Sequence, residues 1–176
     1  SSTGSAVAVA AGIVPMAVGT DTSHSITACA MGNGICGLKP PAGVLSQEGI
    51  IPISKTFDSA GAMAQNVSDT LKLYSAMRDE PLPEITQTPA GKLRISVNIA
   101  NADMNPQERR KYLDGVIETL RTNGVVISEV NQPPTPELSS IMKREFGTGL
   151  EAYLRKSAAK LKTLKQIVEY YEAHPD

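Results

Sequence analysis

The stretch SSTGSAVAVAAGIVPMAVGTDTSHSI, residues 1–26, sets the order of the first structural elements. Within it, residues 5–11 are small and mostly apolar, and Gly12 stands where the C′ residue of a helix is expected. Residues 13–18 form an apolar run of strand length. The stretch therefore predicts a closely packed helix and then a strand, and residues 20–34 are expected to form a loop that leads into a short buried helix.

The next segment is dominated by turn-forming residues. Residues 35–39 predict a strand, which the following Pro-Pro pair would end because proline cannot donate to a ladder. Residues 40–65 are rich in Gly, Pro and Ser and are expected to form an ordered, loop-rich wrap. The apolar residues of this wrap that we expect in the core are Ile50, Ile51 and Ile53.

Helical and strand patterns alternate in the rest of the chain. Asn66 is a good N-cap and Asp69 stands in the first turn after it, so a helix is predicted to begin there. Residues 93–98 and 125–130 have the alternation and composition of strands. Two further helices are predicted after the next proline pair, at about 136–155 and 162–173.

A helix is predicted between the two later strands. Asn105 and Pro106 suit the N-cap and N1 positions, and Glu108 at N3 completes an arrangement like a capping box. The pattern ends at Asn123-Gly124. A strand, helix and strand in this order predict a parallel pair of strands joined by a crossover.

Composition narrows the function classes. The formal net charge is −1, which argues against a nucleic-acid binder, and an apolar run of about 18 residues, as in a membrane span, is absent. Cys29 and Cys36 are too few for a disulfide framework, and His and Cys do not have metal-site spacing. We therefore expect a cytoplasmic protein without a metal ion or cofactor.

Hydroxyl groups are dense in the first 27 residues. They are Ser1, Ser2, Thr3, Ser5, Thr20, Thr22, Ser23, Ser25 and Thr27. One interpretation is a turn-rich region in which these side chains cap backbone groups. The other is a serine nucleophile within a site built from loop backbone.

A serine nucleophile needs a base, and the sequence alone leaves its identity open. His24 is adjacent to Ser25, so the two side chains are not expected to face each other, and His174 lies at the far end of the chain. A Ser-His-Asp triad is therefore poorly supported. A desolvated lysine can also act as a base, and Lys39 and Lys55 are the nearest candidates, although neither stands in a motif. Ser1 could alternatively use its own α-amine as base, or simply mark a cut in the chain.

Several segments together resemble the amidase signature family. Residues 1–26 resemble its Gly-Gly-Ser-Ser-x-Gly-Ser start, Ala-rich helix and Gly-Thr-Asp/Glu-x-x-Gly-Ser segment. Residues 57–70, FDSAGAMAQNVSDT, resemble its Asp-x-x-Gly-Pro-Met-Ala-Arg-Thr/Ser-Val-x-Asp stretch. The similarity continues at residues 34–40, 49–54, 144–156 and 164–176, where the last two segments resemble bacterial members close to peptide amidases. The resemblance implies an α/β fold with a mixed sheet flanked by helices.

The resemblance also implies a chemistry. The family hydrolyses carboxamides through an acyl-serine with a Ser-Ser-Lys triad. By position, Ser25 matches the nucleophile and Ser1 the bridging serine. The backbone N–H groups that match the oxyanion hole are those of Thr22, Ser23, His24 and Ser25. Ser2 matches a serine beside the bridging one, and Asp21 matches an acid that braces the loop. The implied substrate is a small-molecule or peptide amide.

Three features depart from the family pattern. The family's lysine lies upstream of the signature and has no counterpart here, so the chain by itself is expected to be inactive. His24 replaces the usual Gly before the nucleophile; if that position needs a positive φ, His24 would be strained or would remodel the loop. Thr27 replaces an Arg that many members carry, although peptide-amidase-like members lack it as well.

The matched region predicts a partial domain over residues 1–176. Residues 1–80 would hold the signature and nucleophile core, and residues 90–176 the strand-helix-strand unit and the C-terminal helices. Such a partial domain would expose core surface, which a second copy of the chain could cover in a homo-oligomer.

Two other function classes stay open. A non-catalytic amidase-like binding or assembly protein is favoured by His24 at the position before the nucleophile. A small α/β ligand-binding domain built on residues 93–130 is the third interpretation, although no motif supports it.

Overall fold

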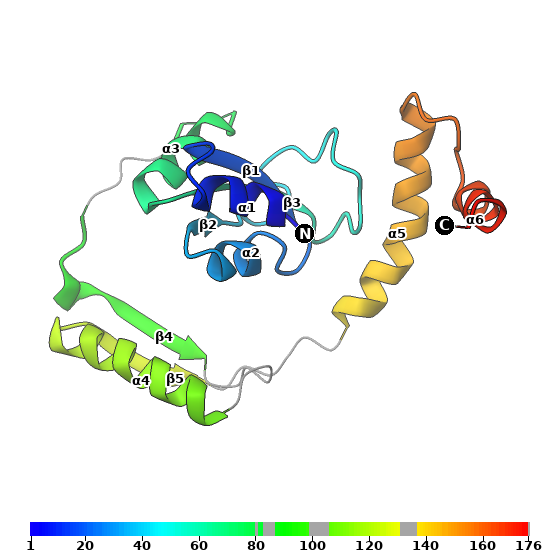
Figure 1. Ribbon diagram of the computed structural model, residues 1–176. Helices are drawn as coiled ribbons and strands as arrows, with labels where there is room; N and C mark the ends of the chain where they lie inside the picture. The colour runs from blue at the N-terminus through cyan, green and yellow to red at the C-terminus, as the bar shows by residue number, and fades with distance from the viewer. Residues whose placement is uncertain (80, 83–86, 99–105, 131–136, 176) are drawn as a thin grey trace. The chain divides into compact units, whose positions relative to one another are not determined.

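Residues 1–79, 81–82, 87–98, 106–130 and 137–175 are described by a computed structural model (Figure 1). The chain divides into two units, Ser1–Leu82 with Glu137–Asp176, and Pro83–Pro136. The C-terminal helices thus group with residues 1–82. The predicted division into residues 1–80 and 90–176 stays a prediction.

The first unit is built on a three-stranded antiparallel sheet in the order β1-β3-β2. The strands are β1 (Met16–Asp21), β2 (Cys36–Leu38) and the central β3 (Ser59–Ala64). All six residues of β3 are buried. These residues were predicted to lie in the loop-rich wrap, and that prediction was wrong. Ser, Ala and Gly are not typical strand residues, but a strand buried on both faces by closely packed neighbours has little room for larger side chains.

Alternate residues of β3 supply two separate cores. Ala60 and Ala62 pack with Leu45 and with Tyr74 of α3 (Val67–Ala76). Met63 packs on the opposite side with Ala6 and Ile26, beside the helices α1 (Thr3–Ala10) and α2 (Thr27–Gly32). The sheet therefore has helices on both faces, and the predicted α/β fold class is confirmed.

The side chain of Ile26 packs against the sheet over three glycines, one from each strand. Added methyl groups at Gly19, Gly61 and Gly37 would lie 3.1, 2.7 and 3.2 Å from atoms of the Ile26 side chain. Ile26 itself is fully buried. Because real Cβ atoms rarely approach this closely, the glycines are what let the residue after Ser25 pack down onto the sheet.

Local signals placed most helices of the first unit correctly. The side chain of Asn66 accepts a hydrogen bond from the Asp69 N–H, as expected of the N-cap of α3. Gly12 has a φ of 70°, the left-handed conformation typical of a helix C′ residue. The first strand begins three residues later than predicted, directly after Pro15, whose nitrogen cannot donate to the ladder.

Two of the three isoleucines of the loop-rich wrap are not core residues. Ile50 packs against the cluster around Leu45, whereas Ile51 and Ile53 are exposed, with 62% and 42% of their surface accessible. The expected anchoring by Ile51 and Ile53 was therefore wrong.

The C-terminal part of the first unit is a pair of helices, α5 (Leu138–Lys156) and α6 (Leu164–Ala173). Thr163 and Gln166 form a capping box at the start of α6. Glu151 of α5 accepts a hydrogen bond from the Leu164 N–H at 3.1 Å, which joins the two helices. Both helices match the predicted ranges closely.

The second unit contains the predicted strand-helix-strand arrangement. The strands β4 (Arg94–Asn98) and β5 (Val126–Val130) pair in parallel. A short 3₁₀ turn, η1 (Ala90–Lys92), precedes β4, and α4 (Pro106–Thr122) lies between the strands in sequence. Helix α4 begins at the predicted proline, whereas its predicted N-cap, Asn105, lies outside the described residues. Gly124 follows it with a φ of 84°.

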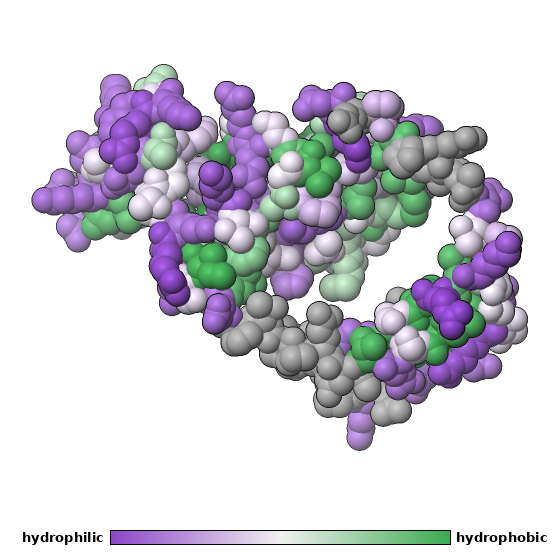
Figure 2. All heavy atoms as spheres, turned by 180° about the vertical axis from the view of Figure 1, so that it is seen from behind, coloured by the Kyte–Doolittle hydropathy of each residue, from purple (hydrophilic) through white to green (hydrophobic). Residues whose placement is uncertain are grey.

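Apolar side chains also reach the surface, as the green areas of Figure 2 show. The most exposed are Ile13, Met31 and Tyr171, with 74%, 80% and 71% of their surface accessible. The homo-oligomer expected from the sequence stays a prediction. None of the helices in the described ranges is both long and apolar enough to cross a bilayer.

We expect Gly61→Ala to lower the free energy of unfolding by about 1–3 kcal/mol or more, because overpacking strains a dense core. The added methyl group would lie 2.2 Å from the Leu38 carbonyl oxygen and would also press on Ile26. Denaturant unfolding of the purified chain measures the change. Gly4→Ala in α1 is the matched control, since the same methyl group meets nothing within 4 Å there. Equal stability of both variants would contradict the close packing described here.

Candidate active site

The loop of residues 22–25 connects β1 to α2. Asp21 directly precedes this loop, and its side chain bonds to the residues that directly follow it. Asp21 is the last residue of β1 and is only 2% exposed. Its Oδ2 accepts hydrogen bonds from the N–H groups of Ile26 at 2.7 Å and Thr27 at 3.3 Å. The carboxylate therefore spans the loop and fixes the residues that follow it. Its other oxygen, Oδ1, is buried without a hydrogen-bond partner within the described residues.

Asp58 holds the N-terminal end of the same loop. The hydroxyl of Thr22 donates to Asp58 Oδ1 at 2.6 Å in a buried contact. Asp58 Oδ2 accepts from the N–H groups of Ile53 and Ser54, at 2.8 and 2.9 Å. A carboxylate with three donors is well satisfied, so it links the loop-rich wrap firmly to residue 22.

The start of the chain lies beside this loop. The Ser2 N–H donates to the Ser25 carbonyl oxygen at 3.1 Å. The Ser2 hydroxyl donates to the Thr20 carbonyl at 2.9 Å and accepts from the Thr20 N–H at 3.0 Å. Gly19 allows this approach, because a methyl group there would lie 2.8 Å from Ser2 Oγ. Residues 1–2 and 25 are thereby brought together although they lie far apart in the sequence.

The two serines predicted to react occupy this junction. Ser25 is half-buried and Ser1 is exposed. Neither hydroxyl takes part in a hydrogen bond with the described residues, so the two are neighbours through the main chain and are not bonded to each other. Their hydroxyls are accordingly available to other groups.

The four backbone N–H groups predicted to bind an oxyanion share one property. Those of Thr22, Ser23, His24 and Ser25 donate to no acceptor among the described residues, whereas the next three N–H groups in the chain are all paired. Unpaired donors in a row on a loop suit an anion, because they can be directed at it without first breaking another bond.

His24 does not cause the strain that was considered for it. Positive φ values among the described residues occur only at glycines, namely Gly12, Gly34, Gly43, Gly49 and Gly124. His24 therefore adopts a backbone conformation open to any residue, and the expected steric cost does not arise. Its side chain is exposed.

The other candidate bases lie elsewhere. His174 stacks on Tyr170 with ring centroids 4.3 Å apart, and its Nδ1 is 2.8 Å from the Tyr170 carbonyl oxygen. The His174 ring therefore contacts the last turn of α6. Lys39 and Lys55 form no hydrogen bond from their ammonium groups to Ser25 within the described residues. A Ser-His-Asp triad is not assembled in the described part of the chain.

Sequence reasoning missed the roles of Asp58 and Glu145. Neither residue was predicted to belong to a site. In the structure Glu145 accepts from the Ser54 hydroxyl, from the Thr56 N–H at 3.0 Å and from the Thr56 hydroxyl at 2.6 Å. These hydrogen bonds, that from Ser54 first, lower the pKa of Glu145 to about 2, and the charge of nearby Lys55 contributes in the same direction. Only the position of Asp58 in the family-like stretch 57–70 could have drawn attention to it.

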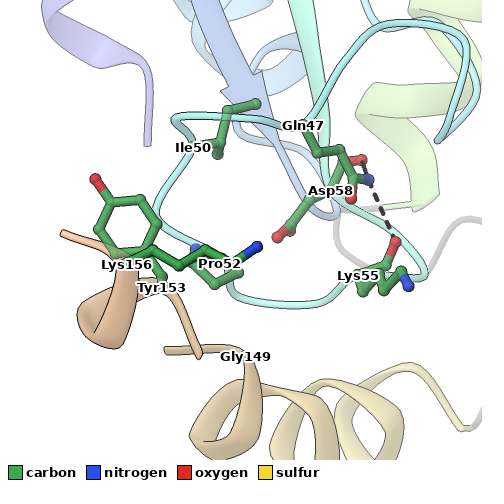
Figure 3. A pocket seen from close by; sticks show the side chains of 8 residues that line it. All are labelled: Gln47, Ile50, Pro52, Lys55, Asp58, Gly149, Tyr153 and Lys156. Carbon is green, nitrogen blue, oxygen red and sulfur yellow. Dashed lines mark hydrogen bonds between the residues drawn. The ribbon is translucent and has the colours of Figure 1, made fainter. Parts of the chain in front are cut away.

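A pocket of about 280 Å³ lies between the loop-rich wrap and α5 (Figure 3). Its lining residues are Gln47, Ile50, Pro52, Lys55, Asp58, Gly149, Tyr153 and Lys156. Figure 3 shows that the first five come from the wrap and the others from α5. The pocket is slightly smaller than the roughly 300–1,000 Å³ usual for ligand sites. One of its lining residues, Asp58, is also the residue that accepts the hydrogen bond from Thr22.

A metal centre has no support in the described ranges. No group of three or more His, Cys, Asp or Glu side chains is placed there to hold an ion.

Comparison with known proteins gives a consistent result. A model of the amidase family matches residues 1–176. A probable amidase of Arabidopsis thaliana is 30% identical over 194 residues, covering 98% of the chain and 38% of the relative. A glutamyl-tRNA(Gln) amidotransferase subunit of Lactobacillus delbrueckii subsp. bulgaricus is 34% identical over 172 residues, covering 87% of the chain and 36% of that protein.

Solved structures of amidase family proteins have a similar fold. An amidase family protein from Bacillus anthracis superimposes with a TM-score of 0.83 at 27% identity, covering 99% of the chain and 38% of that structure. The native peptide amidase from Stenotrophomonas maltophilia gives a TM-score of 0.77 at 30% identity, covering 97% and 39%. The chain thus spans less than two fifths of the length of these relatives.

We expect Thr22→Val to cost about 1–3 kcal/mol of unfolding free energy, because Asp58 Oδ1 would be left buried without its donor. Thr20→Val is the matched control, since it makes the same change at an exposed position two residues earlier and should cost less than about 0.5 kcal/mol. Equilibrium denaturation of both variants tests this. Equal losses would show that the buried contact adds no stability.

The lowered pKa of Glu145 predicts an acid-sensitive contact. Its pKa falls from 4.5 to about 2 in the folded chain, so the folded state favours the ionised group. The resulting stabilisation is complete above pH 4.5 and disappears as the pH falls towards 2. We therefore expect the stability difference between the parent chain and Glu145→Gln to shrink over this interval in denaturant titrations at stepped pH. A constant difference across the interval would be inconsistent with the Glu145 contacts.

Proposed function

This chain belongs to the amidase family, and we propose that it carries the nucleophile and the oxyanion-binding loop of a serine amidase. In this proposal Ser25 attacks a carboxamide and is transiently acylated. Ser1 is the bridging serine. The N–H groups of residues 22–25 bind the developing oxyanion, while Ser2 and Asp21 support the arrangement.

One observation carries the proposal. The Ser2 N–H donates to the Ser25 carbonyl at 3.1 Å, so the residue that follows the proposed bridging serine contacts the main chain of the proposed nucleophile. The row of unpaired N–H groups on the same loop supports it independently, because an acyl-transfer site needs such donors where negative charge develops.

The proposed reaction proceeds in two stages. The Ser25 oxygen bonds to the carbonyl carbon while its proton passes to Ser1, whose own proton passes to a neutral lysine. The carbonyl oxygen becomes an oxyanion among the N–H groups. As the C–N bond breaks, the proton returns along the same path to the leaving ammonia or amine. Water then attacks the acyl-Ser25 ester, which releases the acid and restores the Ser25 hydroxyl.

The lysine of this scheme has no counterpart in residues 1–176. In the family it lies upstream of the segment that residues 1–26 resemble. We therefore propose that the 176-residue chain alone does not turn over amides, and that a longer protein containing it would supply the base. Loss of one member of such a unit typically removes several orders of magnitude in rate.

The proposed substrate is a small-molecule or peptide amide. The likeness to a peptide amidase at 30% identity supports this class. A second candidate is a non-catalytic binding or assembly protein of the same family. It is favoured by the exposed His24, which stands directly before Ser25 where other members have Gly.

We expect Ser25→Ala to abolish amide hydrolysis by a longer protein containing this sequence, lowering kcat by about 10⁴-fold or more. Release of ammonia from a panel of peptide amides and simple carboxamides is the assay. Ser68→Ala, at an exposed serine of α3, is the control and should retain full activity. Activity that survives Ser25→Ala would refute the nucleophile assignment, and an inactive parent protein would favour the binding or assembly role.

A further inference from the structure

One side chain of helix α5 makes several hydrogen bonds to the loop-rich wrap. Glu145 accepts two hydrogen bonds from Thr56 and one from Ser54, and these residues are 89 and 91 positions away in sequence. All three donors belong to the wrap. A carboxylate that accepts three hydrogen bonds is a strong anchor, because hydrogen bonds to charged groups are about twice as strong as neutral ones.

Ser54 links Glu145 to Asp58 through two hydrogen bonds. The Ser54 hydroxyl donates to Glu145, and the Ser54 N–H donates to Asp58 Oδ2 at 2.9 Å. Ser54 is fully buried, so neither group has water as a ready replacement partner. The position of this residue therefore depends on both carboxylates.

Asp58 in turn contacts the proposed oxyanion loop. Its Oδ1 accepts from the Thr22 hydroxyl, and Thr22 is the first of the four residues whose N–H groups are unpaired within the described chain. A continuous path of hydrogen bonds thus leads from α5 to the loop beside Ser25. Strand pairing could also hold Asp58 without this path, because β1 pairs with β3 and Asp21 lies opposite Ser59, the residue next to Asp58.

We propose that Glu145 is a positioning residue for the loop of residues 22–25, acting through Ser54, Asp58 and Thr22. Its catalytic consequence rests on the proposed amidase function; its structural consequence does not. Glu145 touches no reacting atom in this proposal. It keeps α5 and the loop-rich wrap in the arrangement in which Asp58 meets Thr22.

Hydrogen exchange of the chain, with Glu145→Gln as the variant, tests the coupling directly. We expect exchange to rise about tenfold in residues 53–58. We also expect a rise of about tenfold at the N–H groups of Ile26 and Thr27, which are bonded to Asp21 and are the protected donors within residues 22–27. Thr56→Val, at an exposed position, removes only one of the three donors and should give a smaller rise in both segments.

Glu151→Gln is the matched control. Glu151 lies six residues further along α5 and also accepts a backbone N–H, but that of Leu164 at the start of α6. The control should raise exchange around residue 164 and leave residues 22–27 unchanged. If Glu145→Gln opens residues 53–58 and leaves residues 22–27 as protected as in the parent, strand pairing alone holds the loop and the proposal is wrong.

Kinetics separate this proposal from the proposed function. In an active longer protein, Glu145→Gln should lower kcat about tenfold and leave KM within about twofold, since only the transition state uses the oxyanion donors fully. Unchanged kcat together with increased exchange in residues 22–27 would reject the catalytic part of the proposal. A parent protein without Ser25-dependent activity would instead reject the amidase function, and the exchange result would still decide the coupling.

Discussion

The packing of Ile26 over three glycines is the constraint on which the rest of the first unit depends. Gly19, Gly37 and Gly61 come from three different strands, and their missing side chains leave room for one isoleucine. Because Ile26 directly follows Ser25, its burial fixes the height of the preceding loop above the sheet. The same lack of volume at Gly19 lets Ser2 pair with Thr20 from the opposite direction. A single steric feature thus brings the two serine-bearing segments to one place.

Hydrogen-bonded carboxylates, rather than ion pairs, hold the loops around this place. Asp21, Asp58 and Glu145 each accept backbone N–H groups, and the last two also accept hydroxyls. The ion pairs found within the described ranges lie on exposed surfaces, for example between Lys72 and Asp69. Exposed pairs contribute little, whereas a carboxylate with several short donors restrains both the donors and the chain that carries it. Loop geometry here is therefore set by acceptors placed between segments.

The sequence predicted those features whose causes are local. Caps such as Asn66 and Gly12 act within a few residues, so the helices could be placed before the structure was known. The central strand could not, because its small residues make sense only once the helices on both faces are in place. The contacts of Thr22 with Asp58 and of Ser54 with Glu145 join residues 36 and 91 positions apart, and no spacing pattern reports them. The serine positions came from family resemblance, and local pattern alone left them as turn residues.

The distribution of N–H groups around Asp21 explains how one loop can be both fixed and open. The N–H groups at the start of a helix are natural anion ligands. At the start of α2, the N–H groups of Ile26 and Thr27 are already taken by the Asp21 carboxylate. That internal anion holds the end of the loop, and it leaves the preceding N–H groups of residues 22–25 without a partner in the described chain. Because these four N–H groups have no acceptor to leave within the described chain, they would need little reorganisation to bind the oxyanion of the proposed reaction, and such preorganisation is the main source of electrostatic catalysis.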